Sequence, residues 1–128
     1  MNITKIAGIA ALLAATGVLL GALGAHALKT VLTPDQLLSF ETAVRYQLYH
    51  ALALLVIQGI NVNNPLRNIT TINNCMLAGT VCFSGSIYLL LATHIKALGP
   101  ITPIGGLLLI TAWILLAYNL LTSSTTKN

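Results

Sequence analysis

The spacing of the charged side chains constrains the fold more than any other feature of the chain. No Asp, Glu, Lys or Arg occurs at residues 6–28, 46–66, 68–95 or 97–126, so each of these stretches holds at least 21 uncharged residues. A helix needs about 20 apolar residues to cross the hydrocarbon core of a bilayer. The spacing therefore predicts four membrane-spanning helices.

The composition excludes other classes of protein. Charged residues make up 6% of the 128 residues and hydrophobic residues 56%, whereas a soluble domain has about 25% charged residues. The six Lys and Arg residues that give the net charge of +4 are scattered along the chain and form no basic patch for a nucleic acid. The lipid bilayer, with its headgroups, is the expected partner of these cations.

The first apolar stretch, residues 6–28, resembles a secretory signal with an A-x-A pattern at residues 25–27. Because the apolar run is longer than a usual signal core, we expect it to remain as a helix. Gly17, Gly21 and Ala25 follow at four-residue steps along it. Such a stripe of small residues lets another helix approach closely, within the bundle or, alternatively, in a dimer.

A second helix is predicted over residues 34–60. Thr33 fits its N-cap, a proline occupies the first helical position, and Gln36 can close a capping box. Residues 35–43, which include both acidic residues, are expected to form an amphipathic extension outside the bilayer or at its surface. Residues 61–74 contain six Asn and one Pro, which is typical of a polar loop.

Two further helices are predicted over residues 75–92 and 101–121, with a second small-residue stripe at Ala78, Cys82 and Ser86. The chain is thus expected to be all-α and to form one transmembrane domain. Its four transmembrane helices are expected to make an antiparallel bundle with the amphipathic extension before the second helix.

The third predicted helix also carries hydroxyl groups, at Ser84, Ser86 and Tyr88, which are secondary candidates for a functional role. Serine side chains in membrane helices usually bond their own backbone. Cys75 and Cys82 lie about 10 Å apart along this helix and cannot form a disulfide, so they are expected to be small packing residues.

Alternating spans place both termini and the Asn-rich loop on one side of the membrane and the two shorter turns on the other. The basic residues are then balanced, with Lys29, Arg45 and Lys96 on one side and Lys5, Arg67 and Lys127 on the other. Under the positive-inside rule this count does not decide the orientation. We adopt both termini in the cytoplasm as the expectation.

The main candidate for function is the polar run at residues 41–50. Glu41 and Arg45 are four residues apart with the acid first, the favourable order for a helical ion pair. Together with Tyr49 they form one stripe, which fits an anchor at the membrane interface. His50 is turned about 140° away from Arg45 and shares a second, deeper stripe with Tyr46. Ionisable groups at membrane depth are candidates for function, so Tyr46 and His50 carry that hypothesis.

The three histidines, His26, His50 and His94, fall toward the same side of the membrane. A metal site would need two or three of them to converge with a carboxylate, and no H-x-x-x-H or E-x-x-H spacing occurs, so neither a metal nor a cofactor is expected. Capping of helix ends accounts for His26 and His94. For His50 an interhelical hydrogen bond is expected, with proton handling alongside Tyr46 as the alternative.

Four blocks of sequence carry a family resemblance. They are GALGAHAL at residues 21–28, FETAVRYQLYHALA at 40–53, FSGS with a following tyrosine at 83–88, and LGPITPIGG at 98–106. With these blocks the chain resembles the small YgdD-type bacterial inner-membrane proteins, an uncharacterised family defined by a domain of unknown function. The resemblance implies a multi-spanning inner-membrane protein and supplies no activity. The residues that match its motif are His26, Glu41, Arg45, Tyr46 and His50.

Three functions remain open at this point. No nucleophile elbow, phosphate loop or dinucleotide fingerprint is present. A non-enzymatic structural or accessory protein, acting through helix contacts with another copy or another membrane protein, is therefore the leading hypothesis. The alternative is a small transporter or channel for protons or a small solute, with Tyr46 and His50 on the path and Glu41–Arg45 at its mouth. A metal- or haem-binding redox subunit would rest on the histidines alone.

Overall fold

The computed structural model describes residues 2–123, which fold into four long α-helices and two short 3₁₀ turns. The elements are α1 (Ile3–Ala25), η1 (Ala27–Thr30), α2 (Pro34–Asn63), α3 (Ile69–Thr93), η2 (Lys96–Leu98) and α4 (Ile101–Ser123). The predicted all-α class is confirmed. α1 ends three residues earlier than predicted, because the chain tightens into η1 there.

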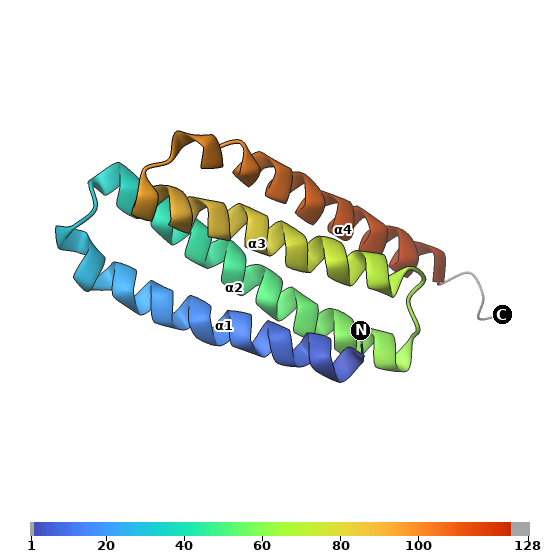
Figure 1. Ribbon diagram of the computed structural model, residues 1–128. Coiled ribbons are helices and arrows are strands. Elements are labelled where there is room, and N and C mark those ends of the chain that lie inside the picture. Colours follow the sequence, from blue (N-terminus) through green and yellow to red (C-terminus); the bar gives the residue numbers. More distant parts are fainter. Residues whose placement is uncertain (1, 124–128) are drawn as a thin grey trace.

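Consecutive helices run antiparallel and pack in chain order (Figure 1). α1 packs on α2, α2 on α3 and α3 on α4, so α1 and α4 lie at opposite edges. Buried apolar side chains of all four helices nevertheless join one cluster. Its members are Ile6, Ala10, Leu54, Ile57, Leu66, Ile72, Met76, Leu109, Ala112 and Leu116.

The capping box expected from the sequence fixes the start of α2. The Thr33 hydroxyl accepts a hydrogen bond from the backbone N–H of Gln36 at 3.3 Å. The Gln36 side-chain oxygen accepts one from the backbone N–H of Thr33 at 3.0 Å. Two backbone donors that a helix start would leave unpaired are thus satisfied within four residues.

The connection between α2 and α3 is much shorter than the polar loop predicted over residues 61–74. α2 continues to Asn63 and α3 begins at Ile69. Asparagine competes with helix formation because its amide bonds the nearby backbone. The buried amide of Asn73 instead bonds the side chain of Gln58 on α2, which removes that competition.

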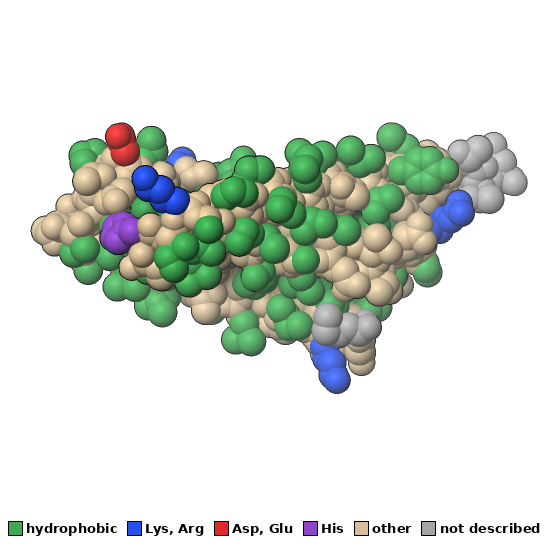
Figure 2. Space-filling view, turned by 45° about the horizontal axis from the view of Figure 1, so that its top comes forward, with side chains coloured by type: hydrophobic (Ala, Val, Ile, Leu, Met, Phe, Trp, Pro, Cys, Tyr) green, Lys and Arg blue, Asp and Glu red, His purple; other side chains and the backbone are tan. Residues whose placement is uncertain are grey.

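The surface of the bundle is suited to lipid. Three segments of residues 2–123 are long and apolar enough to cross a membrane, namely Ile3–Ala25, Ile69–Thr93 and Lys96–Ser123. Large hydrophobic side chains are exposed on every long helix, among them Leu19, Val56, Leu89 and Ile114. Figure 2 shows hydrophobic side chains along the length of one face, with charged side chains toward its ends. A contiguous apolar surface of this kind indicates a bilayer environment.

Glycines allow close contact between α3 and α4. A Cβ atom on Gly105 would lie 2.4 Å from the backbone nitrogen of Phe83. A Cβ atom on Gly79 would lie 2.8 Å from the Leu109 side chain and 3.0 Å from the carbonyl oxygen of Gly105. Helices in lipid associate through close packing of this kind, because burying apolar side chains provides little driving force there.

On α1, the small residues that face α2 are Gly17, Gly21 and Gly24. Cβ atoms on Gly17 and Gly24 would lie within 3.0 Å of side chains of α2, and a Cβ on Gly21 within 3.4 Å. Ala25, the last residue of the predicted stripe, is exposed. Each four-residue step turns 40° around a helix, so the third residue of such a stripe drifts off the contact face. The step of three from Gly21 to Gly24 corrects this drift.

The stripe predicted on α3 departs from the observed packing in the same way. Ala78 is exposed, whereas its neighbour Gly79 is buried against α4. Cys82 is half-buried and Ser86 is buried. Cys75 and Cys82 are both free cysteines, as the spacing along one helix predicted.

We expect Gly105→Ala to destabilise the bundle, because the added methyl group would meet the backbone of α3. Overpacking of this kind typically costs about 1–3 kcal/mol. Denaturant unfolding in detergent micelles, followed by circular dichroism, measures the free energy of unfolding. Gly59→Ala is the matched control, since a Cβ at Gly59 meets nothing within 4 Å. Equal stability of the two variants would contradict the close contact.

Candidate functional site

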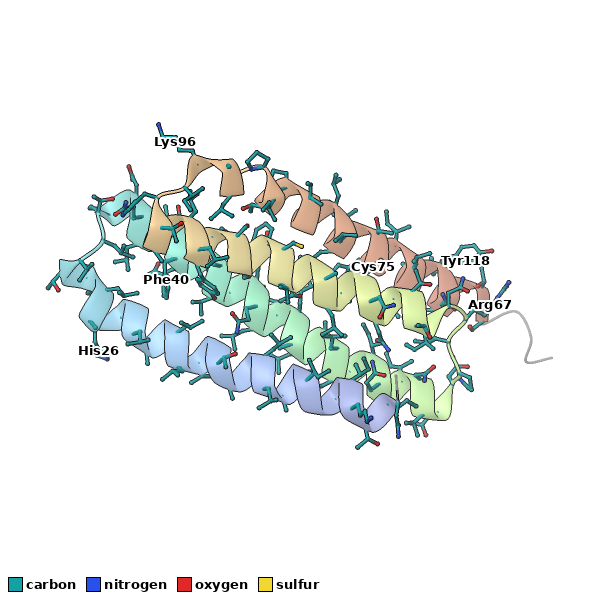
Figure 3. All side chains as sticks on the ribbon, viewed as in Figure 1. His26, Phe40, Arg67, Cys75, Lys96 and Tyr118 are labelled. Carbon is teal, nitrogen blue, oxygen red and sulfur yellow. The ribbon has the colours of Figure 1, made fainter. Side chains whose placement is uncertain are left out.

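The five residues of the predicted polar cluster do not form one site. His26 lies exposed just after the end of α1, at the same end of the bundle as Lys96 (Figure 3). Glu41 and Arg45 are exposed on the side of α2 that adjoins α1. Tyr46 and His50 lie on the other side of α2, against α3 and α4. The two stripes inferred from helical geometry therefore belong to different helix contacts.

Glu41 and Arg45 form the polar rim of a shallow pocket of about 230 Å³ between α1 and α2. Gly21 and Gly24 of α1 and Phe40 and Val44 of α2 form the rest of its lining. Two exposed charges beside apolar side chains fit a position at the membrane surface. The ion pair between them stays a prediction.

His50 is buried and both of its ring nitrogens have partners. Nδ1 lies 2.7 Å from the backbone carbonyl oxygen of Tyr46, and the indole N–H of Trp113 on α4 donates to Nε2 at 3.1 Å. An indole N–H can only donate and a carbonyl oxygen can only accept. The imidazole is therefore neutral, with its proton on Nδ1. The expected interhelical bond of His50 is made by Trp113.

Ring side chains surround this hydrogen bond. Tyr46 stacks on Phe83 of α3 with the ring centroids 4.5 Å apart and the planes 24° apart. Tyr46 also stacks on His50, at 5.9 Å, and lies 6.3 Å from Tyr49. Tyr49 thus joins the Tyr46–His50 side of the helix instead of the anchor stripe to which the sequence assigned it.

These rings line a groove of about 440 Å³ between α2 and α4, with Phe83 of α3 between them. The lining residues are Tyr46, Tyr49, His50, Phe83, Gly106, Leu109, Ile110 and Trp113. Tyr46, Tyr49, Ile110 and Trp113 are each at least 40% exposed, so the groove opens to the outside of the bundle.

Gln47, which was not among the candidates, is a polar side chain of α2 that bonds two other helices. Its amide nitrogen donates to the backbone carbonyl of Leu13 and to the hydroxyl of Thr16 on α1, both at 2.9 Å. Its amide oxygen accepts from the Tyr88 hydroxyl of α3 at 2.8 Å. One buried side chain therefore joins three helices.

Other buried polar side chains also bridge helices. Gln58 of α2 donates to Asn73 of α3 at 2.8 Å. Ser84 donates to the carbonyl of Ala43 on α2 at 2.7 Å, instead of bonding its own helix as expected. Ser86 donates to the carbonyl of Phe83 on its own helix and shares a hydrogen bond with Thr102 of α4.

A signal for the glutamines was present in the sequence. Gln47 and Gln58 are 11 residues apart, which brings them to within about 20° of the same helix face. Polar groups on one face of a membrane helix usually point into the bundle. The hydrogen bond from Trp113 to His50 could not be predicted in this way, because the sequence does not show which helix faces α4.

The remaining histidine, His94, ends α3 in a left-handed conformation with φ at 57°. Its backbone N–H bonds the carbonyl of Leu90 at 2.8 Å, so the main chain caps the helix end. Within residues 2–123, no group of three or more His, Cys, Asp or Glu side chains is placed to hold a metal ion. The three histidines stay apart.

Comparison with known proteins places the chain among uncharacterised membrane proteins. A family described as "Protein of unknown function (DUF423)" matches residues 20–106, a range that includes the whole polar cluster. A UPF0382 membrane protein of Staphylococcus aureus is 46% identical over 96 residues, which cover 75% of this chain and 78% of the relative. The UPF0382 membrane protein YwdK of Bacillus subtilis is 42% identical over 98 residues, covering 76% and 80%. No solved structure matches the chain.

These relatives confirm the expectation of a membrane-protein family of unknown function. The narrower YgdD-type grouping stays a prediction. The names of the relatives state a membrane location and no activity, substrate or partner.

We expect Gln47→Leu to destabilise the protein by about 1–2 kcal/mol, since single hydrogen bonds between membrane helices contribute up to about 1.7 kcal/mol. The substitution also leaves the Tyr88 hydroxyl without its acceptor. Adding Tyr88→Phe removes that hydroxyl and should recover part of the loss, which a double-mutant cycle in detergent measures. Tyr118→Phe, at an exposed tyrosine of α4, is the control and should change nothing. Strict additivity of the two single variants would argue against the bond.

Proposed function

This chain belongs to the DUF423 family of uncharacterised membrane proteins, and from that premise we propose that it is a non-enzymatic accessory protein of the bacterial inner membrane. It crosses the bilayer four times and acts through contacts between its helices and those of a second copy or another membrane protein. The buried hydrogen-bond network is the observation that supports this proposal most strongly.

In this proposal α2 crosses the membrane together with the three more apolar helices. Its 30 residues extend about 45 Å, against roughly 30 Å for the hydrocarbon core, so the helix crosses with room for an interfacial start at residues 34–43. It lies between α1 and α3, which both run along it. Its polar side chains Gln47, His50 and Gln58 are buried and hydrogen-bonded inside the bundle, so they do not meet lipid.

The buried polar side chains of the bundle are hydrogen-bonded within the protein. Among the buried side-chain nitrogen and oxygen atoms of residues 2–123, only Oδ1 of Asn119 lacks a hydrogen-bond partner. A transport path needs polar groups that can exchange partners with a passing ion or solute. Both nitrogens of the His50 imidazole already have partners within the protein, which argues against a path along Tyr46 and His50. The transport alternative therefore lacks support, whereas a structural role accounts for the hydrogen bonds between the helices.

The surfaces left for a partner are the outer faces of the edge helices α1 and α4. Exposed apolar side chains cover both, among them Leu12, Val18 and Leu19 on α1 and Leu107, Ile114 and Leu121 on α4. α1 packs mainly against α2 and α4 mainly against α3, which leaves one side of each helix open. Lipid or another membrane helix can cover these faces.

The proposed orientation places both termini in the cytoplasm. The N-terminus and the α2–α3 connection then lie inside, and η1 and η2 lie outside (Figure 1). A fluorescent protein that matures only in the cytoplasm, fused after residue 128, should be bright. The same reporter fused after residue 64, in a chain truncated there, should also be bright, and one fused after residue 97 should be dark. A bright fusion at residue 97 would contradict this orientation.

Photo-cross-linking in native membranes tests the proposed contacts. We expect a photo-reactive amino acid at Leu19 or Ile114, each 62% exposed on an edge helix, to give one discrete protein adduct of defined mass. The same amino acid at Ile72, which is fully buried, is the control and should give no adduct with another chain. Adducts with lipid alone at both edge positions would overturn the proposal.

A further inference from the structure

We propose that the groove between α2 and α4, defined above by its lining from Tyr46 to Trp113, binds the ring of a lipid-soluble quinone-class compound. Such a compound combines a planar ring with carbonyl or hydroxyl oxygens and an apolar tail. The inference concerns binding only and goes beyond the helix contacts proposed above.

The position of the groove restricts its ligand to a molecule that travels in the bilayer. Trp113 lies 12 residues after the start of α4 and 10 before its end, and Phe83 lies 14 residues after the start of α3 and 10 before its end. The groove is therefore near the middle of the bundle and opens sideways through exposed residues. Water-soluble metabolites do not reach this depth.

The walls of the groove suit a flat ring. Of the seven aromatic residues in the chain, four line it, namely Tyr46, Tyr49, Phe83 and Trp113. An aromatic belt gathers Trp and Tyr at the two membrane interfaces, which does not account for Phe83 and Trp113 at mid-helix. Tyr46 and Phe83 stack on each other with centroids 4.5 Å and planes 24° apart, and aromatic side chains of this kind attract the face or edge of a further ring. An acyl chain gains only dispersion contacts from such faces, without the added stacking preference of a ring.

The groove also offers one donor and one acceptor at a single point. The indole N–H of Trp113 and Nε2 of His50 now bond each other at 3.1 Å. A ring carbonyl entering the groove can replace Nε2 as the acceptor of the indole N–H, and a ring hydroxyl can replace the indole as the donor to Nε2, which carries no proton because the ring proton is on Nδ1. Both the carbonyl and the hydroxyl form of a quinone-class ring can therefore be held by the same pair.

Gly106 leaves the space for the ring. It lines the groove, and a Cβ there would lie 3.8 Å from Phe83, an ordinary contact that disturbs no backbone. Larger side chains at this position would therefore extend into the groove while α4 keeps its place. In contrast, Gly105 is fixed by packing and cannot be used in this way.

Tryptophan fluorescence tests the proposal directly, because Trp113 is the only tryptophan of the chain and lines the groove. The full chain in phosphatidylcholine nanodiscs is titrated with a short-tailed benzoquinone. We expect saturable quenching of Trp113. We expect Gly106→Ala to weaken the apparent affinity and Gly106→Leu to weaken it about tenfold or more. Gly59→Leu, at an open position of α2, is the matched control and should behave as the parent chain.

Three outcomes would overturn the proposal. Quenching that rises without saturation and equally in all variants would show partitioning into lipid only. Quenching by bromine-labelled phosphatidylcholine that depends on Gly106 and is not displaced by the quinone would assign the groove to an acyl chain. Emission that changes with the number of chains per disc, and not with quinone, would assign it to a second copy. If Gly106→Leu fails to fold, as judged by circular dichroism, an unaltered affinity in Gly106→Ala decides against the proposal.

Discussion

The absence of water in the bilayer core is the constraint on which the rest of this structure depends. α2 is the least apolar of the four long helices, and a polar group without a partner costs several kcal/mol in lipid. The helix is therefore stable only between neighbours that satisfy its side chains. Gln47 bonds both α1 and α3, Gln58 bonds α3, and His50 bonds α4. Polar residues on one helix thus bond side chains or main chain of all three others.

Features that depend on local geometry could be predicted from the sequence. Four long helices within the charge-free stretches, the capping box at Thr33 and the opposite directions of Arg45 and His50 were predicted from helix length, capping chemistry and helix periodicity, and the structure has all three features. The Asn-rich connection could not be predicted in the same way. Whether Asn73 favours a loop or a helix depends on Gln58, which lies 15 residues away along the chain and is adjacent only after folding.

The candidate site shows the same division between local and tertiary information. The sequence singled out Tyr46 and His50, but their surroundings are supplied by Phe83 and Trp113, which come from two other helices. Similarly, the small-residue stripe predicted on α1 ended at Ala25, whereas the residue that packs against α2 is Gly24. The difference is a single residue in the chain, and it changes the direction of the side chain by 100°.

The tautomer of His50 has a consequence for the electrostatics of the bundle centre. The indole of Trp113 can only give a proton and the carbonyl of Tyr46 can only receive one, so the three groups form a hydrogen-bond chain with a fixed polarity. Hydrogen bonds in series polarise one another, and the effect is stronger in a medium of low dielectric constant. The covalent structures of the indole and the carbonyl therefore set the direction of polarity through the imidazole.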